Sequence, residues 1–413
     1  MVGGKTKYDC IVIGGGPAGM MAAIRSGELK KKVLLLEKNE TLGNKLLLTG
    51  DGRCNLSHLE KDNKNFVEKF GKKGDFLLSP FSIFGPKKTF DFFENQGLVL
   101  SAEDDGRIFP KSNKAKDVLK VLLKLLKQYR VDILYGEELK KIIYDNSKIE
   151  KIALNNGIEI KAENYIIACG GKSYPNTGSN RSGFLLAQKL GHKIIDTYPA
   201  LVPIKLKNLW IKDIVGISLS NIQMKVLVGN RKVFNRVGDI LFTHFGITGP
   251  VVLNASNYIE NNKVEIILDF FPKENFVSLK SKIQDCINAN ENKAIKNALN
   301  LLPERIIELV LKTSNISEVK KGKTVSKKEI NILAEKMKNF EVDFDKLMDF
   351  NMAMVTGGGV DLREIDAKTM RSKIVSNLFF AGEIIDLIGE TGGYNLQLCF
   401  TTGYVAGNSA SSV

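Results

Sequence analysis

Cysteine and histidine are scarce in this 413-residue chain, which contains 5 Cys and 3 His. The cysteines are scattered and odd in number, and no two of them form a CxxC pair. This pattern argues against a disulfide framework and against a structural zinc site. The histidines lie far apart in the sequence, so we expect no metal site.

Long apolar runs are also absent from the sequence. The apolar, uncharged stretch over 10–24 is interrupted by the run Gly14 to Pro17. It is too short and too rich in glycine to span a bilayer. The first residues lack the apolar core of a signal peptide. We therefore expect a soluble, cytoplasmic protein without a membrane partner.

Acidic residues are fewer than basic ones, with 46 Asp and Glu against 60 Lys and Arg and a net charge of +14. Net charge bears on partners rather than on the fold. One interpretation is a nucleic-acid or other anionic partner. The other is a lysine-rich proteome, because the excess is spread along the chain. The 43% hydrophobic and 26% charged residues are typical of a folded globular protein.

The N-terminal segment has the hydrophobic pattern of a strand, a helix and a second strand. Residues 8–13 form a short apolar, β-branched run, 20–25 are helix-like, and 32–37 form a second apolar run. A unit of this kind, about 30 residues long, is typical of a parallel, doubly wound sheet. We therefore predict an α/β fold class.

The pattern changes along the rest of the chain. An amphipathic helix over 115–130, strands over 131–134 and 165–169, and a hairpin over 148–160 continue the α/β character. Short strand-like segments follow residue 193, and 274–336 is helical and basic. We expect an α/β domain made of 1–192 and 350–413, an inserted β domain made of 193–273 and 337–349, and a helical insert at 274–336.

A glycine-rich GxGxxG motif, Gly14 to Gly19, connects the first strand to the helix. Its first glycine permits a tight turn, Gly16 lets a pyrophosphate approach the backbone, and the last glycine lets the helix pack on the strand. Glu37 ends the second strand, where an acid accepts hydrogen bonds from an adenosine ribose. These features favour a dinucleotide over a glycine-rich turn that binds nothing, without deciding between NAD and FAD.

The C-terminal segment favours FAD. Residues 377–383 form a strand that ends in Gly382 and Glu383. In flavoproteins of the two-dinucleotide type a Gly-Asp pair stands here, and its carboxylate binds ribityl hydroxyls. Glu383 would do so with a longer arm, although an exposed loop acid is the alternative. The helix after 389–397 would direct its positive N-terminus at the flavin, or would serve helix packing alone.

The segment 42–55 holds the candidate catalytic residues Cys54, Arg53 and Lys45. Its glycines leave room for a flat ring against the backbone. Cys54 is interpreted as a proton donor or redox thiol, with a buried structural cysteine as the alternative. Lys45 is interpreted as a flavin contact, with a solvated lysine as the alternative.

Five stretches of the sequence together resemble the HI0933-like flavoproteins, a family that includes a bile-acid reductase and a ribosomal RNA dihydrouridine synthase. The stretches are Gly14 to Gly19 with Glu37, Thr49 to Asn55, Gly106 to Pro110, Phe242 to Pro250, and Val355 to Gln397. The resemblance covers nearly the whole chain. It implies a Rossmann-like FAD-binding domain from both termini, an inserted β-barrel-like domain and a small helical domain, and flavin-dependent reduction of a C=C bond conjugated to a carbonyl.

The expected cofactor is FAD, with NAD(P)H as the expected electron donor. Because no second GxGxxG follows a strand, NAD(P)H would visit the flavin face transiently, or another reductant would serve. The candidate cofactor-binding residues are Gly14, Gly16, Pro17, Ala18, Gly19, Glu37, Lys38, Lys45, Gly52, Arg53, Cys54, Gly170, Gly382, Glu383, Gly392, Gly393, Tyr394 and Asn395.

Three functions remain open at this point. The first is reduction of a uridine of large-subunit ribosomal RNA to dihydrouridine, for which the basic charge supplies backbone attraction, although no RNA-binding signature is present. The second is reduction of a small apolar enone, such as a steroid. The third is a flavin-binding protein without turnover. The sequence leaves the oligomeric state undetermined.

Overall fold

The computed structural model describes residues 7–60, 62–145, 147–259 and 263–412. The chain divides into two compact units, one made of Met1–Ala200 and Phe350–Val413 and the other of Leu201–Asp349. The sequence predicted that the inserted domain begins at residue 193, whereas the second unit begins at Leu201. Residues Ile194–Ala200 form strand β10, which pairs with β18 (Val355–Val360) and therefore belongs to the first unit.

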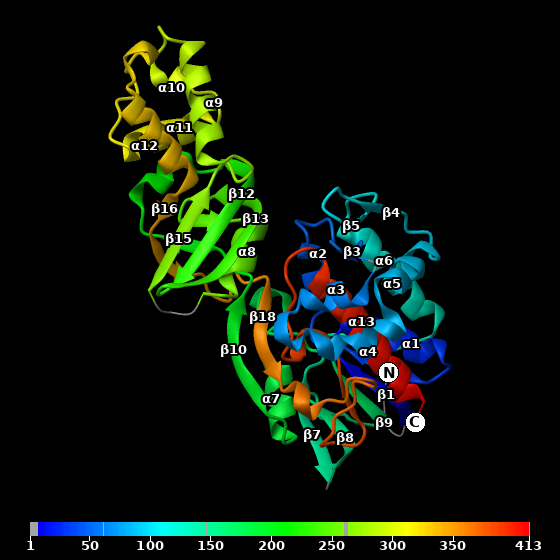
Figure 1. The fold of residues 1–413 in the computed structure, drawn as a ribbon. Coiled ribbons are helices and arrows are strands. Elements are labelled where there is room, and N and C mark those ends of the chain that lie inside the picture. The colour runs from blue at the N-terminus through cyan, green and yellow to red at the C-terminus, as the bar shows by residue number, and fades with distance from the viewer. Residues whose placement is uncertain (1–6, 61, 146, 260–262, 413) are drawn as a thin grey trace. The chain divides into compact units, whose positions relative to one another are not determined.

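A parallel sheet is the centre of the first unit (Figure 1). Its parallel strands, in spatial order, are β6 (Asp132–Leu134), β2 (Val33–Leu36), β1 (Lys7–Ile13), β9 (Glu159–Ile167) and β19 (Leu378–Phe380). Both ends of the chain therefore contribute to one sheet. The predicted α/β class with a Rossmann-like domain is confirmed.

Strand β9 has two kinds of partner along its length. Its first residues pair antiparallel with β8 (Lys148–Leu154), which is the predicted hairpin, and the rest pairs parallel with β1. The hairpin arm and the strand predicted at 165–169 are thus one continuous strand. No turn interrupts the described chain between these two predicted strands, because β9 is extended throughout.

Two helices from opposite ends of the sequence lie side by side, α1 (Pro17–Glu28) and α13 (Tyr394–Ser411), as Figure 1 shows. Added Cβ atoms at Gly403 and Gly407 would lie 2.3 Å from the carbonyl oxygens of Ala18 and Ala22. The helices approach closely because these positions lack side chains. Strand β1 is buried beneath them, which fixes the turn between β1 and α1 in a rigid core.

The remaining elements of the first unit surround this sheet. They are α2 (Asn44–Leu48), β3 (Ser57–His58), α3 (Asn63–Glu68), η1 (Gly71–Leu77), α4 (Leu78–Phe84), α5 (Pro86–Glu94), β4 (Leu100–Ala102), β5 (Arg107–Pro110), α6 (Ala115–Gln128), β7 (Leu139–Asp145), η2 (Pro175–Thr177), α7 (Ser182–Lys189), η5 (Leu362–Glu364) and η6 (Gly382–Ile384).

The second unit contains a seven-stranded sheet and a group of helices. The strands are β11 (Ile204–Leu206), β12 (Ser218–Val228), β13 (Arg231–Phe242), β14 (Gly246–Thr248), β15 (Val264–Asp269), β16 (Phe340–Val342) and β17 (Phe344–Leu347). The helices are η3 (Leu209–Ile214), α8 (Pro250–Ser256), α9 (Phe276–Asn288), α10 (Ile295–Ala298), α11 (Glu304–Thr313), η4 (Gly322–Thr324) and α12 (Lys327–Lys338).

Sheet and helices of the second unit share one hydrophobic core. The sheet order is β16-β15-β12-β13-β14-β11-β17, and within the described part of the chain β16 and β17 are its two edges. Asp343 alone separates these edge strands in the sequence. Among the described residues, no pairing between β16 and β17 closes the sheet, so the predicted barrel-like form of this domain stays a prediction. The predicted helical segment 274–336 corresponds to α9 to α12.

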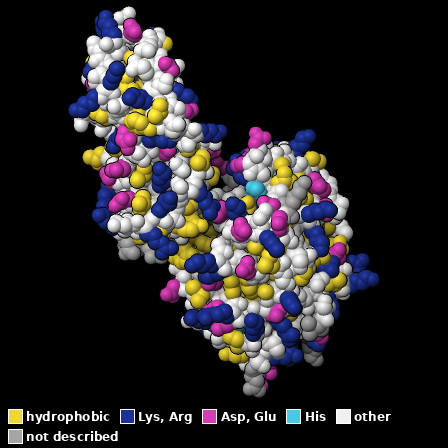
Figure 2. All heavy atoms as spheres, viewed as in Figure 1, with side chains coloured by type: hydrophobic (Ala, Val, Ile, Leu, Met, Phe, Trp, Pro, Cys, Tyr) yellow, Lys and Arg dark blue, Asp and Glu magenta, His cyan; other side chains and the backbone are white. Residues whose placement is uncertain are grey.

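Basic side chains are distributed over the visible face of each unit and are interspersed with acidic ones, as Figure 2 shows. The net charge of +14 is therefore a general property of the surface and not of a single patch on this face. Across the described ranges, no helix combines the length and apolar character needed to cross a membrane.

Candidate functional site

The turn between β1 and α1 has the backbone geometry that a phosphate requires. Gly14 adopts φ +109°, and an added Cβ would lie 2.5 Å from the Ala168 carbonyl oxygen. At Gly19 an added Cβ would lie 1.8 Å from the Gly14 oxygen, so both positions are closed by the protein itself. Gly16 is different, because nothing lies within 4 Å of its added Cβ. Open space therefore remains at the N-terminus of α1, where Gly16 is the N-cap and Pro17 is the first helical residue.

Glu37, just after β2, is anchored beside this turn. Its Oε2 accepts a hydrogen bond from the Gly15 backbone N–H at 2.8 Å, and its Oε1 accepts from the Asn39 backbone N–H at 2.9 Å and side-chain Nδ2 at 2.8 Å. The side chain is nearly buried, at 9% exposure. These contacts fix the carboxylate at the edge of the turn, and Oε2, which accepts only one of them, retains capacity to accept a hydroxyl.

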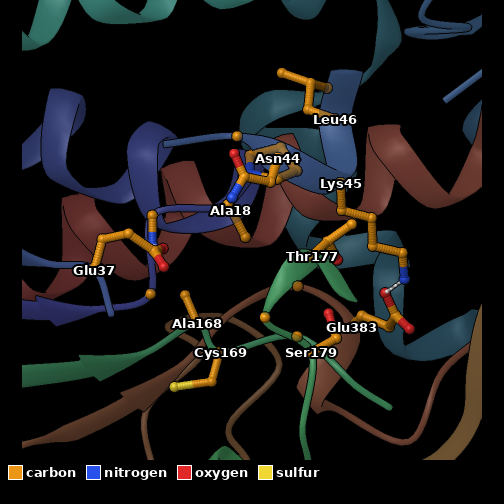
Figure 3. A pocket seen from close by; sticks show the side chains of 18 of the residues that line it. Ala18, Glu37, Asn44, Lys45, Leu46, Ala168, Cys169, Thr177, Ser179 and Glu383 are labelled. Carbon is orange, nitrogen blue, oxygen red and sulfur yellow. Dashed lines mark hydrogen bonds and ion pairs between the residues drawn. The ribbon is translucent and has the colours of Figure 1, made fainter. Parts of the chain in front are cut away.

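A second anchored carboxylate belongs to Glu383 in η6. Its Oε2 accepts a hydrogen bond from Lys45 Nζ at 2.6 Å, and its Oε1 accepts from Ser173 Oγ at 2.9 Å and the Thr356 N–H at 2.8 Å. Lys45 also donates to Ser173 Oγ at 2.7 Å. Figure 3 shows Lys45 and Glu383 pointing toward each other at one end of the pocket, with Glu37 at the other. The pair neutralises two charges that are largely removed from solvent.

One cavity connects the two carboxylates. The sequence-predicted residues that line it are Gly14, Gly16, Pro17, Ala18, Glu37, Lys38, Lys45, Gly170, Gly382, Glu383 and Asn395. An elongated cavity with an open helix N-terminus between two hydrogen-bonding ends fits a dinucleotide. The first unit thus brings together residues that lie more than 300 positions apart in the chain, such as Lys45 and Glu383.

Gly52, Arg53 and Cys54 do not line this cavity. Arg53 forms an ion pair with Glu103 at 2.7 Å and lies over the Phe109 ring at 4.1 Å. Cys54 is completely buried, and burial raises the pKa of its thiol to about 12. A thiol without access to the cavity cannot transfer a proton to a substrate there. The hypothesis that Cys54 is catalytic therefore does not fit its position, whereas the structural alternative does.

Gly392, Gly393 and Tyr394 shape the start of α13 and are also absent from the cavity lining. Gly393 is the N-cap with φ +97°, and an added Cβ would lie 2.3 Å from the Ser57 carbonyl oxygen. Tyr394 is buried and stacks on His58 with a centroid distance of 5.1 Å. Their contacts favour a supporting role beneath the cavity wall.

Asn395 lines the cavity and also holds the preceding turn, since its side-chain amide exchanges two hydrogen bonds with the backbone of Gly389. Sequence reasoning missed Ser173, Thr356 and Asn39, which orient the two carboxylates. Asn39 lies two residues after Glu37, so its contact with the carboxylate could have been predicted from the sequence. Ser173 and Thr356 lie 183 positions apart, and no spacing rule connects them.

The fold and the cavity define a protein with a Rossmann-type dinucleotide site, and its family and relatives make it a flavin-dependent oxidoreductase. The profile of the HI0933-like protein Rossmann domain matches residues 8–409, so the chain belongs to the HI0933-like family.

Similar proteins of known name cover nearly the whole chain. The 3-dehydro-bile acid delta(4,6)-reductase of Clostridium scindens is 28% identical over 408 residues, which are 97% of this chain and 98% of the relative. The ribosomal RNA dihydrouridine synthase of Escherichia coli is 26% identical over 404 residues, 96% of each chain. Among solved structures, the 3-ketosteroid-delta4-(5alpha)-dehydrogenase of Rhodococcus jostii RHA1 has a TM-score of 0.57 at 15% identity, covering 100% of this chain and 98% of that one. The last similarity concerns the fold.

Proposed function

We propose that FAD occupies the cavity of the first unit, with its adenosine ribose at Glu37, its pyrophosphate at Gly16 and its ribityl chain and ring near Glu383. The open space above Gly16 carries this assignment, because it is the one glycine of the motif whose added side chain would meet no protein atom. Lys38, Gly170 and Asn395 complete the proposed contacts from the cavity wall. A bound, reduced flavin supplies a hydride to an electron-poor carbon.

The reaction is the reduction of a C=C bond conjugated to a carbonyl, and the substrate is a uridine of large-subunit ribosomal RNA, which becomes dihydrouridine. The relatives named ribosomal RNA dihydrouridine synthase, from Escherichia coli and from Haemophilus influenzae, support this substrate. The net charge of +14 supports it too, since phosphate backbones attract basic surfaces. The target base must be single-stranded or flipped out of a helix to reach the enzyme.

A small apolar enone is the second candidate substrate. The bile-acid reductase of Clostridium scindens, as similar to this chain as the RNA enzymes, favours it. The partly exposed side chains of Leu48 and Met354 offer apolar contacts, and Met354 lines the cavity. Both substrates present the same reacting group, so the proposed chemistry is common to them.

NAD(P)H is the proposed electron donor and visits the site transiently. The absence of a second GxGxxG after a strand supports transient rather than permanent binding of this donor. Steady oxidation of NADH or NADPH that increases with added substrate would support the donor. It would also exclude a flavin-binding protein without turnover.

Nucleoside mass spectrometry of large-subunit RNA tests the substrate. RNA from a strain that lacks the gene is expected to lose dihydrouridine at a specific position, and a plasmid copy of the gene is expected to restore it. A plasmid copy carrying Gly16→Val is the matched control and is expected not to restore it. Unchanged dihydrouridine in the deletion strain contradicts the RNA assignment and leaves the small apolar enone as the candidate substrate.

A further inference from the structure

Tyr174 is not itself a lining residue of the cavity, but it contacts two residues that are, Met354 and Lys45, and it has no role in the contacts described so far. It follows Ser173, whose hydroxyl bonds Lys45 and Glu383. Lys45 Nζ is 6.0 Å from the centroid of the Tyr174 ring, and Thr177, three residues on, lines the cavity. Tyr174 is therefore next to the network that holds the proposed ring end of the site.

The backbone of Tyr174 is held in an unusual conformation. Its φ of 55° and ψ of 60° lie in the left-handed region, which an aromatic residue rarely adopts. Its carbonyl oxygen accepts hydrogen bonds from the Thr177 N–H at 2.9 Å and from Thr177 Oγ1 at 2.7 Å, and Pro175 follows. Strained residues of this kind gather at functional sites, where surrounding contacts hold them in place. These contacts hold the backbone from which the ring projects.

The phenol proton of Tyr174 has a weak partner at the cavity wall. The hydroxyl donates to Met354 Sδ at 3.4 Å, and a thioether is a poor acceptor. Met354 lines the cavity and is 38% exposed, so the hydroxyl lies beside accessible space. Burial, and then the nearby Asp51 carboxylate, raise the pKa of Tyr174 above its ordinary value. The phenol thus keeps its proton at neutral pH and is able to donate it.

We propose that Tyr174 is the general acid of the reduction, donating its phenol proton to the carbon next to the carbonyl. This inference rests on the proposed function. Hydride addition at the β carbon breaks the C=C π bond and leaves an electron pair on the α carbon, conjugated with the carbonyl. The Tyr174 O–H bond breaks, a new C–H bond forms at the α carbon, and the phenolate regains a proton from water. The two electrons come from the reduced flavin, which a nicotinamide or dithionite restores.

Neither of the other candidates fits this step as well. Cys54 is completely buried, whereas the Tyr174 hydroxyl lies beside the partly exposed Met354. Lys45 donates two of its three ammonium N–H groups to Glu383 and to Ser173, and its charge balances the Glu383 carboxylate, so losing a proton would break this ion pair. Tyr174 carries a proton that is held only by a weak acceptor beside accessible space.

Tyr174→Phe tests the proposal because it removes the hydroxyl and keeps the ring. FAD-loaded protein is reduced with dithionite without oxygen and mixed with large-subunit RNA from the deletion strain, and in parallel with 4-androstene-3,17-dione. The variant is expected to bind FAD and to accept electrons as wild type does. Its flavin reoxidation by substrate is expected to slow by about 100-fold or more, the usual scale for a lost general acid. Tyr144→Phe, on β7, is the matched control, because the Tyr144 hydroxyl donates to the Lys189 carbonyl oxygen and not to a cavity-lining residue; it is expected to react like wild type.

Two further measurements separate an acid from a structural ring. The wild-type rate is expected to fall at high pH as the phenol ionises, and Tyr174→Phe is expected to lack this decline. An ultraviolet difference titration of the FAD-free proteins is expected to show one phenol fewer in the variant, with a midpoint above the ordinary value of 10.

Reoxidation of Tyr174→Phe within about threefold of wild type overturns the acid role while the proposed function stands. The same holds if Tyr174→Phe is normal and only Tyr174→Ala is slow, since that result assigns the ring a packing role. If wild type reduces neither substrate, the proposed function fails first and the acid role fails with it.

Discussion

Gly16→Val directly perturbs the space assigned to the pyrophosphate. Gly16 has φ −76° and ψ −178°, an extended conformation that any residue adopts, and nothing lies within 4 Å of an added Cβ. The substitution therefore causes neither backbone strain nor a clash in the FAD-free protein. Its free energy of unfolding is expected to change by no more than about 0.5 kcal/mol, as for a surface substitution.

The effect on FAD is expected to be large. The valine methyls would occupy the position from which a phosphate accepts backbone N–H groups at the start of α1. Losing two hydrogen bonds to a charged group costs about 1.5–3 kcal/mol each, or about 3–6 kcal/mol in total. At 1.4 kcal/mol for each factor of ten, FAD affinity is expected to fall by about 10²- to 10⁴-fold.

Calorimetric titration of FAD into the apo-proteins, with thermal melts of the same samples, measures both effects. Gly19→Ala is the contrasting variant, because its Cβ would lie 1.8 Å from the Gly14 carbonyl oxygen and strain the fold itself. It is expected to melt at a lower temperature even without FAD. A folded Gly16→Val protein that retains stoichiometric FAD would falsify the pyrophosphate assignment.

Three other substitutions test separate parts of the account. Glu37→Leu leaves the Gly15 N–H without its acceptor and removes the proposed ribose contact. The affinity for FAD is therefore expected to fall by about tenfold or more. An unchanged affinity would place the ribose elsewhere. Cys54→Ala is expected to lower the melting temperature, because the buried thiol packs in the core. The rate of flavin reoxidation by substrate is expected to stay within about threefold of wild type. A decrease of this rate by about 100-fold in stopped-flow traces would restore the catalytic hypothesis. The ion pair with Lys320 lowers the pKa of Glu329 from 4.5 to about 2. The ionised carboxylate therefore stabilises the second unit above about pH 4.5, and this stabilisation is lost as the pH falls toward 2. Melts of Glu329→Gln are expected to lie below wild type at pH 7 and to converge with it on acidification, and a constant gap would be inconsistent with this linkage.

The sequence predicted those parts of the fold that depend on local pattern. The apolar run ending at Ile13, the glycines of the turn and the acid at Glu37 follow one another along the chain, so periodicity and spacing were sufficient to predict the βαβ unit. The helix over 115–130 was predicted for the same reason and is α6.

The parts that depend on distant residues were not predicted. The contacts of Glu383 with Lys45 and Ser173 exist because β19 pairs with β9, which no local signal indicates. The role of Cys54 was left open between a proton donor and a buried structural cysteine for a similar reason. Its neighbours in sequence, Gly50 and Gly52, suggested an open loop, but the chain turns the thiol into the core, where it has no exposed surface. Burial of a single side chain is a tertiary property that a glycine-rich segment does not reveal.

The stoichiometry of a single turnover tests the central claim most directly. Purified protein carrying FAD is reduced with dithionite, freed of excess reductant and mixed without oxygen with large-subunit RNA from the deletion strain. The account predicts that flavin reoxidation and dihydrouridine formation, the latter counted by nucleoside mass spectrometry, occur in equal amounts and at the same rate. Protein that holds no FAD after reconstitution, or a reduced flavin that stays reduced in the presence of both the RNA and 4-androstene-3,17-dione, would contradict it.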